Sequence, residues 1–336
     1  MNKNLFSFLV IIFFLQTVLA QDKINNNTSV VDSMKRASDN PSLSSELDST
    51  RYMADNTIKK DDVGIKDSSG FNSRVMLNTP PKWYDMFTNI PGDLASFYEN
   101  EITIKNIPLF LGISAATAIL IATDQKTYEA SDRFYHKKVF YKNWSDIFVS
   151  IGDGKSQFGI SAAFALYGFA ASDNRALRTA SQVFEAVLTS GGVVQVIKHI
   201  TGRESPFTAT KDGGTWRFFP NQIKYHKHVP HYDAFPSGHL TTSIAAFVVI
   251  ADNYPEVTWI KPVAYTLSTL IGISMVNQGI HWYSDYPLAI FLGYSFGKIA
   301  SSHSFISGDE NKADSGLHIQ PYFGYNGNGL SVIYKL

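Results

Sequence analysis

Residues 236–251 read PSGHLTTSIAAFVVIA, a short glycine turn that runs directly into an apolar stretch. The length of the apolar stretch and its small and branched side chains favour a helix over a strand. A turn of this kind leaves free backbone N–H groups at the start of the helix, where an anion is readily bound. Gly238 lets the backbone approach a ligand closely, and His239 in the first helical turn would face that ligand.

Five further apolar segments have the same character, and Asp, Pro and Gly punctuate the gaps between them. Together with residues 240–251, they cover residues 107–123, 158–171, 180–197, 259–276 and 287–300. We therefore predict an all-α domain built as a six-helix core bundle, in which short loops make successive helices antiparallel. Near the C-terminus, residues 317–325 and 330–336 flank Asn-Gly-Asn-Gly, which predicts a short β-hairpin packed on the helical domain.

The N-terminal part of the chain has a different composition. Residues 1–20 combine Lys3, an apolar run and small residues up to Ala20, the pattern of a cleaved secretory signal. Residues 21–80 are rich in Asn, Ser, Asp and Lys, so we expect a disordered tether. The helical domain would then occupy residues 81–305, and residues 306–336 would form a linker and the hairpin.

The chain is expected to work outside the cytoplasm, but its relation to the membrane is left open by the sequence. Segment 107–123 approaches the length of a span, whereas 158–171 and 240–251 are shorter than about seventeen residues. Glu185 and Gln195 interrupt segment 180–197. We expect a periplasmic domain or one associated with the membrane of the cell envelope.

Composition excludes several classes of chemistry. The 336 residues include no cysteine, so disulfides and thiolate catalysis are excluded. The 29 basic and 29 acidic residues balance, which gives no reason to expect nucleic-acid binding. His226, His228 and His231 form a group without a matching carboxylate spacing, so we interpret them as an active-site rim. We expect neither a metal nor a cofactor.

Unusual polar residues collect at the ends of the predicted helices. Lys198 and Arg203 follow the third helix, and residues 281–285 lead into the sixth. In an antiparallel bundle these groups share one end with the turn before the fourth helix. His281 and Asp285 are four residues apart, close enough for the carboxylate to orient the imidazole. Such a set suits phosphoryl transfer through a phosphohistidine.

Three motifs in the chain resemble the signatures of the type-2 phosphatidic-acid phosphatases, a superfamily that includes bacterial acid phosphatases and vanadium haloperoxidases. The motifs run from Lys198 to Pro206, through residues 236–239, and from Ser274 to Asp285. The resemblance spans roughly residues 83 to 303 and implies a helical core.

The resemblance also implies a role for each residue. His281 would attack phosphorus, Asp285 would orient it, and His239 would protonate the leaving oxygen. Lys198 would hold the phosphoryl oxygens, together with the backbone N–H groups near Ser237 and Gly238.

Two positions depart from the family pattern. Ser205 and Met275 stand where the family usually has phosphate-binding arginines, and such contacts are charge-assisted and often bidentate. We expect Arg203 to bind the phosphate instead, with Arg217 or Lys211 as substitutes. The predicted function is metal-independent hydrolysis of phosphate monoesters or pyrophosphates, on a phosphorylated small molecule or an envelope lipid. A vanadate-dependent haloperoxidase and a non-catalytic scaffold are the alternatives.

Overall fold

The computed structural model describes residues 64–65, 74–77, 79–306, 316–324 and 327–335. The predicted signal lies outside these residues, and so does most of the predicted tether, so both stay predictions. The described chain divides into two units, one made of residues 79–304 and one of the short flanking strands. Each unit is considered by itself.

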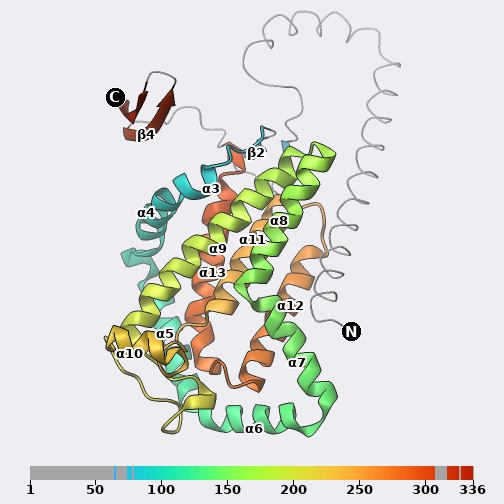
Figure 1. The fold of residues 1–336 in the computed structure, drawn as a ribbon, viewed down its shortest axis with the longest axis vertical. Coiled ribbons are helices and arrows are strands. Elements are labelled where there is room, and N and C mark those ends of the chain that lie inside the picture. Colours follow the sequence, from blue (N-terminus) through green and yellow to red (C-terminus); the bar gives the residue numbers. More distant parts are fainter. Residues whose placement is uncertain (1–63, 66–73, 78, 307–315, 325–326, 336) are drawn as a thin grey trace, which may run out of the picture. The chain divides into compact units, whose positions relative to one another are not determined.

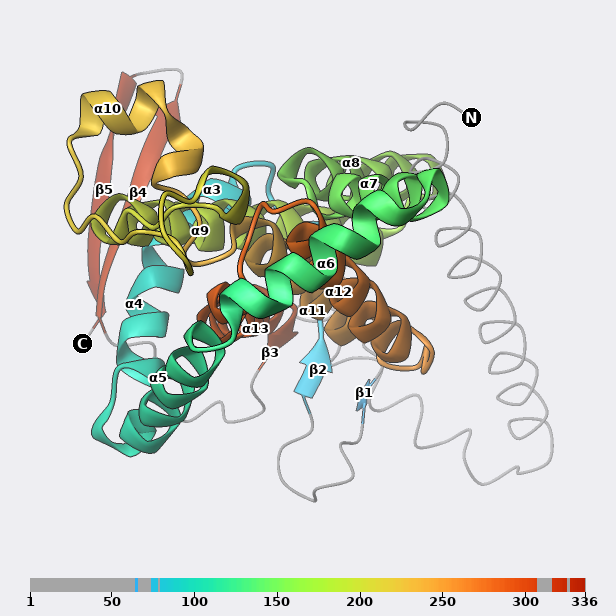
Figure 2. The same cartoon turned by 90° about the horizontal axis from the view of Figure 1, so that it is seen from below.

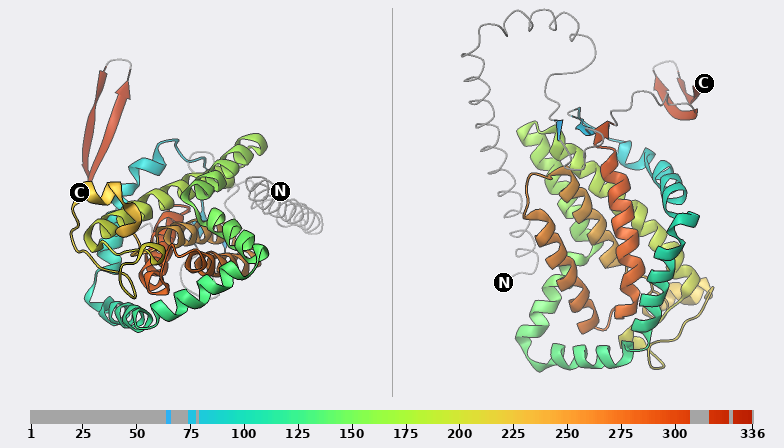
Figure 3. Two further views of the ribbon diagram at one scale, coloured as in Figure 1. Left: turned by 60° about the horizontal axis from the view of Figure 1, so that its bottom comes forward. Right: turned by 180° about the vertical axis from the view of Figure 1, so that it is seen from behind.

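All six helices predicted from the apolar segments are present, which confirms the all-α class of the larger unit (Figure 1). They are α5 (Ile107–Ile121), α8 (Gly154–Ala171), α9 (Asn174–Thr201), α11 (Gly238–Asn253), α12 (Ile260–Asn277) and α13 (Tyr286–Ser302). Helix α11 packs against α9, α12 and α13, and α8 packs on α9. Seen from behind, α5 runs along the flank of the bundle (Figure 3).

Five more helices surround this core, and the sequence did not predict them. They are α3 (Asp85–Thr88), α4 (Ile90–Glu101), α6 (Asp124–Lys137), α7 (Val139–Gly152) and α10 (Gln222–Lys227). Short 3₁₀ turns lie at η2 (Ile104–Asn106), η3 (Pro206–Thr208), η4 (Val229–His231) and η5 (Tyr283–Asp285). Helix α6 crosses one end of the bundle, in front of α11, α12 and α13 when viewed from below (Figure 2).

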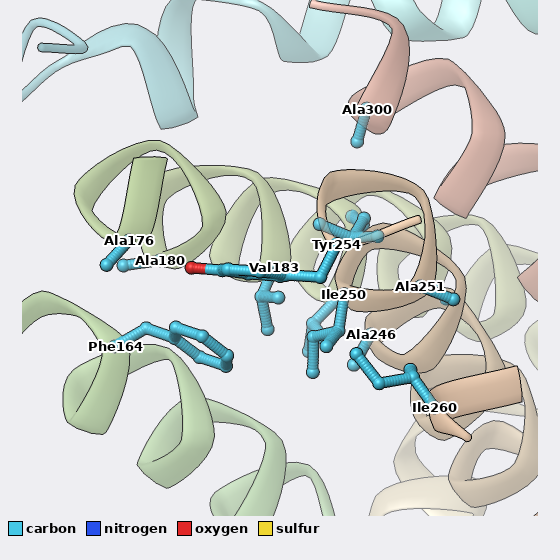
Figure 4. Close-up of a cluster of buried hydrophobic side chains, with 14 of the residues drawn as sticks. Phe164, Ala176, Ala180, Val183, Ala246, Ile250, Ala251, Tyr254, Ile260 and Ala300 are labelled. Atoms are coloured by element: carbon cyan, nitrogen blue, oxygen red, sulfur yellow. The ribbon is translucent and has the colours of Figure 1, made fainter. Parts of the chain in front are cut away.

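Small side chains allow the central helices to pack closely. Ala180 and Val183 of α9 face Ala246 and Ile250 of α11, and these four side chains are buried (Figure 4). Phe164 of α8 completes this cluster on one side. Burial of apolar surface at about 25 cal/mol per Å² makes this cluster a main source of stability, and it fixes where the helix ends lie.

Among the described residues, two helical segments are long and apolar enough to cross a membrane, by length and composition alone: Ile104–Ile121 and Asn174–Thr201. They differ in their surroundings. Helix α9 is half buried among its neighbours, as expected for a core helix. Helix α5 instead presents Leu111 and Ile119 outwards, with 65% and 69% of their surfaces exposed. Its apolar outer face is therefore not explained by packing within this unit.

The second unit consists of short strands. β1 (Gly64–Ile65), β2 (Arg74–Met76) and β3 (Phe305–Ile306) form a small antiparallel sheet in that order. β4 (Gly316–Gly324) pairs antiparallel with β5 (Gly327–Lys335). The turn predicted between the last two strands begins outside the described residues, so the C-terminal hairpin and its packing stay predictions.

Candidate active site

The polar residues singled out in the sequence come together near the start of α6, whose Asp124 contacts Arg203 and Ser284. Figure 2 shows that α6 crosses this end of the bundle. Lys198 lies in the last turn of α9, and His239 lies in the first turn of α11. His281 follows α12 and comes just before η5. The antiparallel order of the helices thus gathers three sequence-distant motifs at one place.

His281 is held by Asp285 on the turn ahead of α13. Its Nδ1 lies 3.4 Å from Oδ2 of Asp285, and both side chains are buried. The backbone N–H of Trp282 donates to the same carboxylate oxygen at 2.8 Å, which fixes its position. A carboxylate beside Nδ1 selects the tautomer that leaves Nε2 as the nucleophilic nitrogen.

The distance of 3.4 Å is longer than a good hydrogen bond. Catalytic hydrogen bonds are often long in ligand-free structures and shorten in the complex. Asp285 ends the 3₁₀ turn η5 and His281 precedes that turn, because Pro287 occupies the first turn of α13 and limits the helix upstream.

The start of α11 forms an anion cradle, which consists of the backbone N–H groups of Gly238 and His239. Neither group donates a hydrogen bond within the described part of the chain. Lys198 lies beside them, since a Cβ added to Gly238 would be 3.6 Å from its Nζ. The ammonium group is 3.5 Å from Asp233 and almost fully buried. Two amides and one cation therefore converge where a phosphoryl group would lie.

The structure places Ser237 at the N-cap of α11. Its Oγ accepts a hydrogen bond from the Leu240 N–H at 3.4 Å and so caps α11. Its own N–H donates to the Asp285 carbonyl at 3.2 Å, and the residue is completely buried. Ser237 therefore positions the cradle against the His281–Asp285 turn. The backbone N–H groups that stay free beside it are those of Gly238 and His239.

His239 faces His281 across the site, with ring centroids 6.1 Å apart and planes inclined by 71°. Burial lowers the pKa of His239 to about 4, and the nearby charges of His281 and Lys198 act in the same direction. The imidazole is therefore neutral near pH 7 when the site holds no anion. A bound phosphate dianion would raise this pKa, because it favours the charged imidazolium.

The side chain of Arg203 contacts carboxylates of the protein and does not point its terminal nitrogens at the cradle. Its Nη1 donates to Asp285 at 2.5 Å and to Ser284 at 2.6 Å. Its Nη2 donates to Asp124 at 2.7 Å. The guanidinium is completely buried and lies over the rings of Trp216 and Trp282. Its terminal nitrogens already hold two carboxylates, so these contacts favour a role in positioning Asp285 over direct binding of phosphate.

Asp124 is part of the site, although the sequence did not indicate it. It is completely buried at the start of α6 and accepts hydrogen bonds from Arg203 and from both the N–H and the hydroxyl of Ser284. Burial raises its pKa in spite of these bonds. Asp124 therefore joins α6 to the catalytic turn. In the sequence, Asp124 is distinguished by its position alone, directly after the apolar segment 107–123 and at the start of a polar stretch.

Met275 and Ser205, the two positions that depart from the family motifs, are both buried. Met275 is buried in a cluster with Ile151, Phe247 and Ile271, so its side chain belongs to the core. Ser205 is buried, and its N–H donates to the Pro230 carbonyl.

The two suggested substitutes for the missing arginines also have other surroundings. Arg217 pairs with Glu204 at 2.6 Å, and Lys211 is exposed to solvent. Burial alone would raise the pKa of Glu204, but hydrogen bonds from Thr210, Thr215 and Arg217 lower it to about 2. Glu204 is therefore ionised and holds Arg217.

Residues 179–306 match the family model of the PAP2 superfamily. The matched segment runs from α9 to the end of α13, and it contains every residue of the site except Asp124. The family resemblance inferred from the motifs is thus confirmed over this PAP2 segment. The three signature regions are those that the helix ends bring together.

The chain is also similar to a solved structure, described as the crystal structure of the first transmembrane PAP2 type phosphatidylglycerolphosphate phosphatase from Bacillus subtilis. The two share 15% identity with a TM-score of 0.42, over 63% of this chain and 99% of the other. No curated protein sequence matches the chain.

Proposed function

We propose that this chain is a phosphohydrolase that acts on phosphate monoesters or pyrophosphates through a phosphohistidine on His281. The observation that carries the proposal is the pairing of His281 with Asp285 opposite His239, beside the cradle of free amides and Lys198. A nucleophile, an orienting carboxylate, a proton donor and an anion site are the four groups that such a reaction needs.

In the first step, Nε2 of His281 attacks phosphorus and the P–O bond to the leaving group breaks. Asp285 stabilises the imidazolium that develops, and His239 gives a proton to the leaving oxygen. In the second step, His239 takes a proton from water, and the resulting hydroxide attacks the phosphohistidine. The P–N bond breaks, and phosphate and neutral His281 are released. Lys198 and the cradle amides stabilise the equatorial phosphoryl oxygens in both steps.

Lys198 supplies a positive charge and the cradle amides supply hydrogen-bond donors to the phosphoryl group. We therefore propose that the reaction needs no added metal. Sequestration of divalent ions by a chelator should then leave turnover intact.

The substrate class that we propose is a lipid phosphate of the cell envelope. A cavity of about 690 Å³ lies among α5, α11, α12 and α13, and its lining is mostly apolar. It includes Leu240, which follows His239, and Tyr283, which follows His281 by two residues. An acyl or prenyl chain matches such a lining. The exposed apolar face of α5 supports association with a membrane, and export through residues 1–20 belongs to the same proposal.

The test is phosphate release by the purified mature protein and by His281→Ala, with a chelator present. The substrates are a chromogenic monoester, phosphatidic acid and a prenyl pyrophosphate. His226→Ala serves as a matched control, because this histidine lies in the exposed rim. We expect turnover by the wild type and the control, and none by His281→Ala. Absence of turnover by a well-folded wild type would refute the proposal and favour the scaffold alternative.

A further inference from the structure

A second cluster of ionisable side chains lies away from the candidate active site, in the region where α4 begins. Asp93 is in the first turn of α4, Glu185 is in the N-terminal half of α9, and His303 directly follows α13. Figure 1 shows α3 and the start of α4 at the end of the bundle opposite α6. The phosphohydrolase mechanism uses none of these three residues.

The three side chains converge on one point. His303 Nε2 lies 2.9 Å from Oδ1 of Asp93 and 3.4 Å from Oε1 of Glu185. One nitrogen and two carboxylate oxygens, all within 4.8 Å of one another, form the set. Ligand atoms of a tetrahedral zinc ion with bonds of about 2.0–2.2 Å lie about 3.3–3.6 Å apart. The two distances from His303 are within a few tenths of an ångström of this spacing, and the set as a whole reaches it with shifts of up to about an ångström.

Glu185 provides an independent reason to expect a ligand. It is completely buried, and its Oε1, which faces the cluster, has no hydrogen-bond partner among the described residues. Its other oxygen accepts a hydrogen bond from the Asn89 side chain at 2.9 Å, which fixes the carboxylate with Oε1 directed at His303. A buried carboxylate oxygen without a hydrogen bond is costly, so it calls for a bound group.

Among the described residues, no ion pair is found between the buried cation Arg178 and the carboxylates of the cluster. Arg178 is buried on the same helix as Glu185, but its guanidinium donates to the backbone carbonyls of Thr79 and His303. Asp93 is also buried. Two buried carboxylates that share one imidazole therefore favour a positive ligand.

We propose that Asp93, Glu185 and His303 bind a divalent transition-metal cation of the zinc class, which ties α4 to α9 and to the end of α13. One imidazole and two carboxylates are typical zinc ligands. His303 is 40% exposed, so solvent reaches the position of a fourth ligand. The metal would stabilise the packing of α4 and would take no part in turnover at the distant active site.

A proton is the competing occupant. Burial raises the pKa of Glu185 to about 9, and the neighbouring Asp93 acts in the same direction. Without a metal, the two carboxylates would share a proton at neutral pH. The two occupants predict different effects of Glu185→Gln. The amide imitates the protonated acid, so the variant should keep its stability if a proton is the occupant. The amide is a poor metal ligand, so the variant should lose zinc binding if a metal is the occupant.

The test is equilibrium dialysis of the full mature chain against ZnCl₂ after removal of metal by a chelator, with bound zinc measured by mass spectrometry. Thermal unfolding is followed in parallel. We expect one zinc ion per chain and a zinc-dependent rise in Tm of several degrees at roughly a hundredfold excess over Kd. Glu185→Gln and His303→Ala should each weaken binding by about tenfold or more.

Two controls keep the proposal falsifiable. His228→Ala removes a histidine of the exposed rim and should bind zinc like the wild type. Glu185→Gln without metal should be as stable as the wild type, which separates loss of the ligand from loss of the fold. Absence of saturable zinc binding by the wild type, or binding by Glu185→Gln equal to that of the wild type, would overturn the proposal. Phosphate release with a chelator tests the proposed function separately.

Discussion

Acidification should destabilise the protein through His239, and His239→Gln should remove this effect. The structure lowers the pKa of His239 from 6.5 to about 4, chiefly by burial. Above pH 6.5 the residue is neutral in both folded and unfolded chains and contributes no pH dependence. As the pH falls from 6.5 towards 4, the unfolded chain takes up a proton that the folded chain does not, so stability is lost over this range.

The size of the effect follows from the same numbers. At 1.36 kcal/mol for each pKa unit, the fall to about 4 corresponds to about 3 kcal/mol, and this is an upper value because water reaches part of the ring. The assay is urea unfolding of wild type and His239→Gln at pH 7.5 and pH 4. The wild type should lose up to about 3 kcal/mol more than the variant, whose glutamine has no proton to gain.

The control for this assay is inorganic phosphate. The phosphate monoanion that prevails at pH 4 should, when bound in the cradle, raise the pKa of His239 and so reduce the difference between wild type and variant. An equal loss of stability in both proteins between pH 7.5 and 4 would refute the reasoning, because it would mean that His239 is not desolvated as described.

Three substitutions test the rest of the site. Asp285→Asn should lower turnover on the order of 10³-fold or more, and should cost about 3 kcal/mol in urea unfolding because it leaves Arg203 without one of its carboxylates. Gly238→Ala should fold normally, since the nearest atom to the added Cβ is 3.6 Å away, but the methyl group should reduce kcat/KM at least about tenfold by filling the cradle. Gly202→Ala should instead lower Tm, with a cost of about 2 kcal/mol or more, because φ is +55° and the Cβ would lie 2.2 Å from the Arg217 carbonyl oxygen. Normal stability of Gly202→Ala, or unchanged kinetics of Gly238→Ala, would contradict these geometries.

The core of the fold could be predicted because each of its helices contains a long run without charge. Helices α9 and α11 bury residues on most of their faces, so their sequences contain long runs without charge. Helix α6 was missed for the opposite reason. It lies across the end of the bundle and carries charged residues on most of its turns, so no apolar run marks it. An amphipathic pattern of this kind is visible only as a period of 3.6 residues.

The site was predictable where its residues lie at helix ends with motif spacing. His239, His281 and Lys198 meet because three antiparallel helices end together. The partners of Arg203 were not predictable, because Asp124 is 79 residues away and no motif connects the two. The hydrogen bond from the Ser237 N–H to the Asp285 carbonyl was not predictable either, because no motif spacing indicates it.

The distribution of charge shows which cation stays available at the site, where Ser205 and Met275 stand in place of the arginines that the type-2 phosphatidic-acid phosphatase motifs usually contain. Arg203 is neutralised by Asp124 and Asp285, and Arg217 is held by Glu204. Lys198 is then the cation left next to the cradle, and Asp233 already offsets part of its charge. A phosphoryl group held by one partly neutralised lysine and two amides binds weakly, since each bidentate arginine contact has been lost.

Under the proposed function, the missing affinity has to come from the rest of the substrate. The apolar cavity beside Leu240 can supply it, because each buried methylene contributes about 0.8 kcal/mol. Two to four methylenes would offset the loss of one charge-assisted contact of about 1.5–3 kcal/mol. Ser205 and Met275 therefore lead us to expect selectivity for long-chain over short-chain phosphates. If the protein bound long-chain and short-chain phosphates with equal affinity, the phosphate would have to bind somewhere other than the cradle.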